Sequence, residues 1–237
     1  MRRAGLAAML LIAGCSDLAQ PPAQDLAVMS SLPLFWKEAD PSKALSAGDQ
    51  RAPIIVQLER SFRVKPIDVF DAETLASFRL LIVAQPRSLA PAELVALDNW
   101  IRRGGRLLIF SDPALYWPSD FALGDPRRPP PVTLLDPLLT HWGLSLSATD
   151  REDRTLAGQS VRAAGTGLLS RGSKACKIHD GGFRAICRMG KGHAEIIADA
   201  DLLDMEGSGD AAEKNAAAVI SVVQMLAKEI SPSVKGN

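Results

Sequence analysis

Residues 80–111, LLIVAQPRSLAPAELVALDNWIRRGGRLLIFS, predict a strand, a helix and a second strand in direct succession. Leu80–Ala84 is apolar throughout, which is typical of a strand buried on both faces of a parallel sheet. Pro91 suits the first turn of a helix, and a Gly-Gly pair follows the last apolar helical position, where helices commonly end. Arg106–Ser111 is again mostly apolar and predicts the next buried strand. This unit indicates a parallel sheet covered by helices.

The same alternation extends over the rest of the chain and predicts an α/β fold with helices on both faces of the sheet. We expect further strands over Ala27–Leu32, Val64–Val69 and Ala194–Ala198, and further helices over Ser42–Phe62, Leu134–Trp142 and a last segment ending near Ile230. These elements predict one domain over residues 27–230 and a flexible tail over residues 231–237.

The first fifteen residues predict a lipoprotein signal. Arg2 and Arg3 supply positive charge, and Leu6–Ala13 is an apolar run too short to span a bilayer. Small residues precede Cys15, as in the lipobox that lipoprotein signal peptidase cleaves. Cleavage would leave Cys15 as the N-terminus, with a diacylglycerol on its thiol and a further acyl chain on its amine. Several acyl chains on one residue give a stable membrane anchor.

We therefore expect a periplasm-facing membrane lipoprotein, in which residues 1–14 are the signal peptide and residues 15–26 a polar lipid tether. An ordinary secretory signal or an uncleaved anchor is the alternative. The sequence holds 27 Lys+Arg and 27 Asp+Glu residues. This neutral balance provides no electrostatic attraction for nucleic acid, so we expect no nucleic-acid partner.

Residues 145–190 predict an irregular insertion that ends in a β-hairpin, in the C-terminal half of the chain. Gly181-Gly182 suits the turn of that hairpin, because both turn positions need positive φ. Counting outward from this turn places Cys176 directly opposite Cys187, at a separation that a disulfide accepts. We expect the disulfide; the alternatives are free buried thiols or a redox or metal pair.

Several aromatic and polar residues follow the expected strands. Because the carboxyl ends of parallel strands meet at one edge of a sheet, we expect these residues to surround one crevice. They are Phe35, Trp36, Gln85, Asp112, Tyr116, Trp117, Asp199 and Asp201. Aromatic side chains beside a few polar groups suit a sugar, a peptide or a partner protein. The alternative is that Trp36 and Trp117 cover the core beneath long loops.

The three aspartates of this set allow two interpretations. Asp112, Asp199 and Asp201 have the chemistry to converge on a cation, or each can cap a turn. We expect capping, and hence no metal. Ser88 and Ser111 follow strands but have no recognisable His-Asp partners, and GxSxG, P-loop, GxGxxG and HExxH motifs are absent from the sequence. The sequence therefore predicts neither a catalytic residue nor a cofactor.

Several segments together resemble a known family. They are Leu89–Leu94, Trp100–Pro113, Leu134–Leu144, Gly190–Asp201 and Asn215. The first two are similar to the helix, double-glycine turn, strand and terminal Asp-Pro of the GldG-like auxiliary proteins of ABC-type uncharacterised transport systems. Leu134–Leu144 is similar to that family's helix ending before a glycine and a hydrophobic residue, and the resemblance covers roughly residues 27–229. The resemblance implies a flavodoxin-like, class I glutamine amidotransferase-like sheet without a transferable catalytic residue. Longer members have a C-terminal membrane helix, so we expect this short form to use Cys15 instead.

The resemblance and the N-terminal signal together favour a non-catalytic accessory or binding lipoprotein of an ABC-type transport or envelope system. Its expected partners are membrane lipid through Cys15 and an ABC permease, another envelope protein or a glycan. Two other functions stay open: a hydrolase or amidotransferase-like enzyme with an unrecognised site at the same sheet edge, and a structural envelope lipoprotein.

Overall fold

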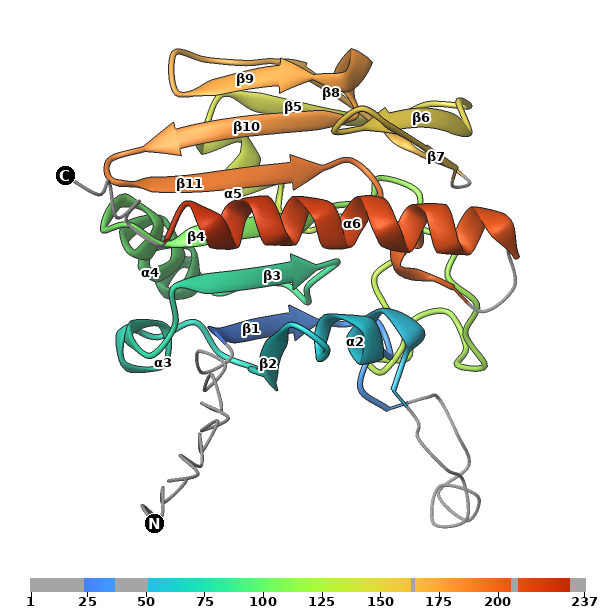
Figure 1. Ribbon diagram of the computed structural model, residues 1–237, viewed down its shortest axis with the longest axis horizontal. Helices are drawn as coiled ribbons and strands as arrows, with labels where there is room; N and C mark the ends of the chain where they lie inside the picture. The colour runs from blue at the N-terminus through green and yellow to red at the C-terminus, as the bar shows by residue number, and fades with distance from the viewer. Residues whose placement is uncertain (1–23, 37–50, 163–164, 206–208, 231–237) are drawn as a thin grey trace, which may run out of the picture.

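A seven-stranded sheet forms the centre of the protein, and its strand order is β2-β1-β3-β4-β11-β10-β9 (Figure 1). The computed structural model describes residues 24–36, 51–162, 165–205 and 209–230. The strands of the sheet are β1 (Gln24–Ser30), β2 (Phe62–Pro66), β3 (Leu80–Ala84), β4 (Arg106–Phe110), β9 (Cys176–His179), β10 (Arg184–Met189) and β11 (Gly192–Ile197).

The first five strands in this order are parallel, and β10 and β9 complete the sheet as antiparallel neighbours. The parallel part has the strand order of flavodoxin-like sheets, in which the chain runs outward in both directions from its first strand. The protein is therefore an α/β protein of the flavodoxin-like class.

Helices cover both faces of the sheet. They are α2 (Pro53–Leu58), α3 (Ala72–Ala76), α4 (Pro91–Arg102), α5 (Asp136–His141) and α6 (Asp210–Lys228). In Figure 1, α6 and α2 lie in front of the sheet and α4 lies behind it. The apolar stripe of α6 is fully buried at Val219, Val222 and Val223, which seals the front face of the core. No helix within the described ranges combines the length and apolar character that crossing a bilayer requires.

The first strand begins earlier than its apolar pattern indicates. β1 starts at Gln24, inside the expected tether, and Asp25 pairs there with Arg63 (2.6 Å) and Lys65 (3.2 Å) of β2. These ion pairs extend the strand through a polar residue that periodicity alone assigns to a linker. β2 likewise ends at Pro66, before the expected Val69.

The expected signal peptide, Cys15, the first half of the Ser42–Phe62 helix and the tail lie outside the described residues. In the described part of that helix, only Pro53–Leu58 is helical, starting with Pro53 in its first turn.

The segment expected to be an irregular insertion contains four short strands. β5 (Leu144–Ala148) pairs with β8 (Gly167–Arg171), and β6 (Asp153–Leu156) pairs with β7 (Gln159–Arg162). β6 and β7 are joined at Ala157 (φ 50°) and Gly158 (φ 83°), a tight turn in which alanine is an unusual first residue. That turn gives only a weak sequence signal, so the strands were missed.

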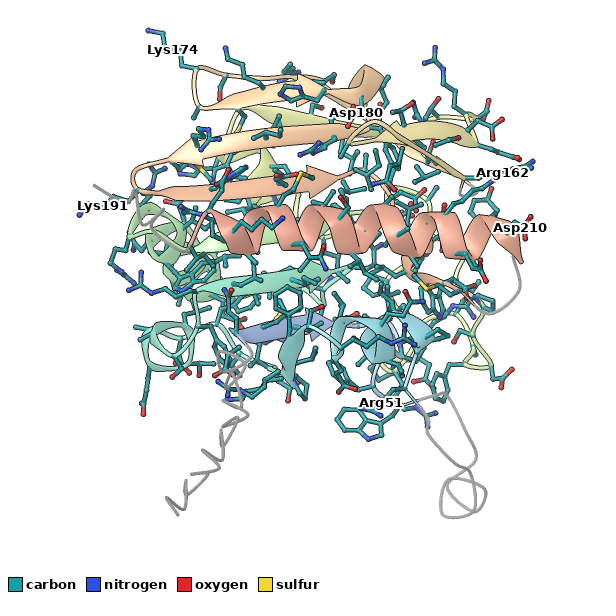
Figure 2. The ribbon with its side chains drawn as sticks, in the orientation of Figure 1. Arg51, Arg162, Lys174, Asp180, Lys191 and Asp210 are labelled. Atoms are coloured by element: carbon teal, nitrogen blue, oxygen red, sulfur yellow. A yellow bond between two sulfur atoms is a disulfide. The ribbon has the colours of Figure 1, made fainter. Side chains whose placement is uncertain are left out.

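The Asn215 and Asp180 side chains help to attach β6 and β7 to the rest of the fold. The Asn215 amide of α6 donates to the Arg162 carbonyl (2.7 Å) and accepts from the Arg162 N–H (3.0 Å). At the other end, the Asp180 carboxylate accepts a hydrogen bond from the Ala157 N–H (3.2 Å). Figure 2 shows Arg162 near the N-terminal end of α6 and Asp180 in the turn between β9 and β10.

The Cys176–Cys187 disulfide joins β9 to β10, with the two Cα atoms 4.0 Å apart. The register is as the sequence predicts, with Arg184 opposite His179 and Cys187 opposite Cys176. The turn differs from the expected two-residue form, because Asp180–Gly182 forms a 3₁₀ turn between the paired residues.

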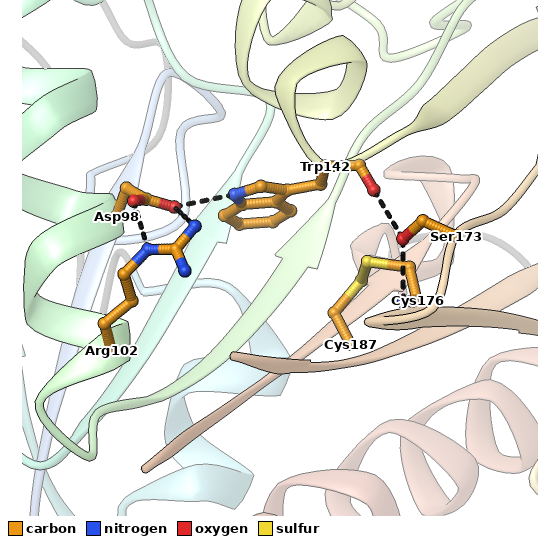
Figure 3. The surroundings of a disulfide bond; sticks show 6 residues. All are labelled: Asp98, Arg102, Trp142, Ser173, Cys176 and Cys187. Carbon is orange, nitrogen blue, oxygen red and sulfur yellow. Dashed lines mark hydrogen bonds and ion pairs between the residues drawn. A yellow bond between two sulfur atoms is a disulfide. The ribbon is translucent and has the colours of Figure 1, made fainter. Parts of the chain in front are cut away.

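A chain of hydrogen bonds connects the disulfide to α4 (Figure 3). The Ser173 hydroxyl accepts from the Cys176 N–H (3.0 Å) and donates to the Trp142 carbonyl (2.9 Å). The Trp142 indole donates to Asp98 (2.9 Å), which also pairs with Arg102 (2.6 Å). The hairpin is therefore fixed to the helix layer behind the sheet.

Candidate functional site

Gln85 connects two loops at the carboxyl edge of the sheet. It directly follows β3, is fully buried and adopts a φ of 40°. Its Nε2 donates to the carbonyl oxygens of Asp112 (3.1 Å) and Pro130 (3.0 Å), and its Oε1 accepts from the Asp112 N–H (2.9 Å). All the polar atoms of this side chain therefore hold neighbouring backbone in place.

Three carboxylates converge beside it. Asp112 follows β4, Asp199 and Asp201 follow β11, and one oxygen from each lies within 4.8 Å of the others. Asp112 and Asp199 are fully buried, and Asp201 is half-buried. The sheet topology thus brings together the three aspartates that the sequence places at strand ends.

Each of these carboxylates also caps backbone N–H groups. Asp112 accepts from Ala114 (2.8 Å) and Ala200 (3.0 Å). Asp199 Oδ1 accepts from Leu202 (2.9 Å), and Asp201 Oδ2 accepts from Tyr116 (2.9 Å). The expected capping roles and the convergence are both present, and the two loops are tied to each other through them.

Burial and mutual repulsion make the carboxylates hard to ionise. Burial raises the pKa of Asp112 above its ordinary value. Burial, together with the charges of Asp112 and Asp201, raises the pKa of Asp199 well above its ordinary value. The pKa of Asp201 is raised to about 7, chiefly by burial. Carboxyl groups so strongly perturbed at a strand edge are typical of functional sites, although structural clusters show them too.

A cavity of about 350 Å³ is lined in part by the segments that follow Asp112 and Asp201, while the three aspartates themselves are not among its lining residues. The loop after β1, the start of α2, the loop after β4 and the segment after Asp201 enclose it. Its lining residues are Pro33, Ala52, Pro53, Trp117, Pro118, Ser119, Asp120, Leu203, Asp204 and Met205. Mixed apolar and acidic walls of this kind suit a ligand or side chain with an apolar body and a polar end.

The predicted aromatic residues fall into two groups. Trp117 lines the cavity, whereas Trp36 is 70% exposed and is not among the lining residues. Phe35 packs partly on the core, 5.9 Å from the Trp36 ring. The Tyr116 side chain is 67% exposed. The hydrogen bond of this residue to the aspartate cluster comes from its backbone N–H, which donates to Asp201.

Sequence reasoning missed most of the cavity wall. Leu203 and Met205 continue the segment that begins at Asp201, so their position was within reach of the strand-end argument. Pro33 directly follows the expected strand Ala27–Leu32 and was equally within reach, whereas Ala52 and Pro53 belong to an expected helix and carried no such signal.

A family comparison identifies the chain. The sequence model of the family described as "ABC-type uncharacterized transport system" matches residues 24–167. The chain belongs to this family. The match runs from β1 to the start of β8 and contains the resembling segments from Leu89 to Leu144, whereas Gly190–Asp201 and Asn215 lie beyond it. No curated protein matches the sequence.

Solved structures with similar folds share little sequence with this ABC-type auxiliary protein. The mmIFT52 N-terminal domain is 15% identical, with a TM-score of 0.57, and covers 90% of this chain and 100% of its own. Cytoplasmic protein STM3548 from Salmonella typhimurium is 6% identical with a TM-score of 0.53, covering 85% and 98%. STM1381 from Salmonella typhimurium LT2 is 10% identical with a TM-score of 0.51, covering 73% and 85%. These similarities support the fold alone.

Proposed function

We propose that this protein is a membrane-tethered, extracytoplasmic accessory lipoprotein of an ABC-type transport system, which binds a partner and catalyses no reaction. The main observation that supports a binding role is the cavity lined by Trp117 at the carboxyl edge of the sheet. Doubly wound sheets bind their ligands at this edge. Membership of the auxiliary family supports an ABC system as the source of the partner.

Two cysteine features support the location outside the cytoplasm. The Cys176–Cys187 disulfide is buried in the sheet, and structural disulfides of this kind persist in oxidising compartments. The lipobox ending at Cys15 supplies the tether.

The surroundings of Ser111 favour binding over nucleophilic catalysis. Its buried hydroxyl shares a 2.5 Å hydrogen bond with Thr133. His193 lies at the amino end of β11, whereas Ser111 follows the carboxyl end of the neighbouring strand β4. The His193 ring is hydrogen-bonded to Glu229 (2.6 Å) and is therefore at the other edge of the sheet from Ser111. Activation of a serine needs a base within hydrogen-bond reach, which this arrangement does not supply.

A hydrolase-type enzyme is the second candidate, and the perturbed aspartates favour it. Asp201 is half-buried with a pKa near neutrality, which suits a general acid or base. For an enzyme, Asp201→Asn would abolish turnover; for a binding protein, the Trp117 side chain is the sensitive position.

Truncation of Trp117 tests the binding role. We expect Trp117→Ala to reduce the recovery of ABC transport components on affinity-tagged protein from native membranes by at least about tenfold. Buried tryptophans at interfaces commonly contribute about 2 kcal/mol or more. The readout is quantitative mass spectrometry after mild cross-linking.

Trp36→Ala is the matched control, because it removes the same side chain from an exposed position outside the cavity. Its recovery should stay within about twofold of the wild type. Undiminished recovery with Trp117→Ala would rule out the cavity as the binding site.

A further inference from the structure

One oxygen of the aspartate cluster has no partner. Asp199 Oδ2 is buried and accepts no hydrogen bond from any described residue, while Oδ1 of the same carboxylate accepts one from Leu202. The side chain is fully buried and faces Asp112 and Asp201, each with an oxygen within 4.8 Å of it. A buried polar atom left without a partner is costly, and it indicates a missing ligand.

Among the described residues, no side-chain cation is paired directly with the cluster, because no lysine or arginine forms an ion pair with Asp112, Asp199 or Asp201. Arg154 is close enough for its charge to interact with Asp199, but its guanidinium donates its hydrogen bonds to Thr166 (3.0 Å) and to the Gly167 carbonyl (2.8 Å). A bound divalent cation supplies the charge that this site lacks.

We propose that Asp112, Asp199 and Asp201 bind one hard divalent cation, with calcium as the ion that fits best. A donor set made only of carboxylate oxygens selects calcium, magnesium or manganese over zinc or copper. Oxygens on opposite sides of a calcium ion are about 5 Å apart, against about 4 Å for magnesium. Separations of up to 4.8 Å are closer to the span of a calcium shell than to the narrower shell of magnesium. Waters or backbone carbonyls complete the six to eight oxygens that calcium takes.

The cation cross-links the two loops that shape the cavity. Asp112 opens the loop that continues to Tyr116 and Trp117, and Asp201 opens the segment that continues to Leu203. The two loops already share the hydrogen bond from the Tyr116 N–H to Asp201. An ion between their carboxylates stiffens the wall that carries Trp117. This inference does not depend on the proposed transport role.

Thermal unfolding of the full-length protein tests the site. Protein stripped with EDTA is titrated with calcium, magnesium and manganese, and calorimetry gives the stoichiometry. We expect one calcium per chain and a rise in Tm of roughly 5–10 °C at about 100-fold excess over Kd. Calcium should give a larger shift than magnesium at equal concentration.

Asp199→Asn keeps the shape of the side chain and removes its charge, so it should abolish the calcium-dependent rise. Asp201→Asn, at a half-buried position, is the second variant in case Asp199→Asn does not fold. Asp153→Asn makes the same charge change on an exposed residue of β6 and should keep the full rise. Absence of a shift with all three ions, or an unchanged shift in both cluster variants, would overturn the site. A larger shift with magnesium would overturn the assignment of calcium.

Discussion

Replacing Cys15 by serine is expected to leave the protein unprocessed or released, and in either case to remove its mature, lipidated form from the membrane. Serine has no thiol to accept the diacylglycerol, so neither the thioether nor the later acyl chain on the amine is made. At least two acyl chains are needed for stable anchoring, and each buried methylene contributes about 0.8 kcal/mol. In ultracentrifugation with immunoblotting, we expect the mature membrane-bound form to fall by more than about tenfold, with the protein either released or left as the longer precursor. Globomycin, which inhibits lipoprotein signal peptidase, should accumulate the precursor of the wild type.

Ser16→Ala changes the neighbouring residue and leaves the lipid attachment site intact, so it should fractionate with the membrane. Membrane association of mature-length Cys15→Ser protein at the wild-type level would show that another feature holds the protein there.

The second large effect is expected at Gly192, the first residue of β11. An added Cβ would lie 1.8 Å from the Ile101 carbonyl oxygen at the end of α4 and 2.8 Å from that of Gly105. The backbone is fixed on both sides of this contact, since Lys191 N–H donates to Arg102 (2.9 Å) and His193 N–H donates to Gly105 (3.1 Å). The clash is therefore with backbone that cannot move aside. We expect Gly192→Ala to reduce the free energy of unfolding in urea by at least about 3 kcal/mol.

Gly181→Ala is the control, because it replaces a glycine by alanine at a position where the added Cβ causes no steric clash. Its φ is 62°, but an added Cβ meets nothing within 4 Å. We expect it to cost only about 1 kcal/mol, from the left-handed backbone conformation. Equal stabilities of the two variants would contradict the close approach of α4 to β11.

The parts of the fold that the sequence predicted are those set by apolar runs and close turns. Leu80–Ala84 is buried at every position, and the helix from Pro91 ends before Gly104-Gly105 as expected. The hairpin register followed from counting residues outward from Gly181-Gly182, and so the disulfide followed as well. β6 and β7 escaped prediction because their positions depend on tertiary hydrogen bonds, such as those of Asn215 and Asp180.

The candidate site was predicted unevenly for a related reason. Parallel topology alone brings Asp112, Asp199 and Asp201 together, because strand ends share one edge. The same rule placed Trp36 beside Trp117, but it says nothing of how a loop turns after its strand. The loop after β1 leaves Trp36 exposed, and it is Pro33 of this loop that lines the cavity together with Trp117.

The most direct test of the central claim is photo-crosslinking in living cells that carry the native ABC system. A photoreactive residue at Asp120, an exposed position lining the cavity, is compared with one at Lys174, an exposed position beyond β8 that Figure 2 shows projecting from the far edge of the molecule. An accessory role predicts an adduct with an ABC transport component from Asp120 and none from Lys174. Equal adducts from both positions, or none with an ABC component from Asp120, would contradict it.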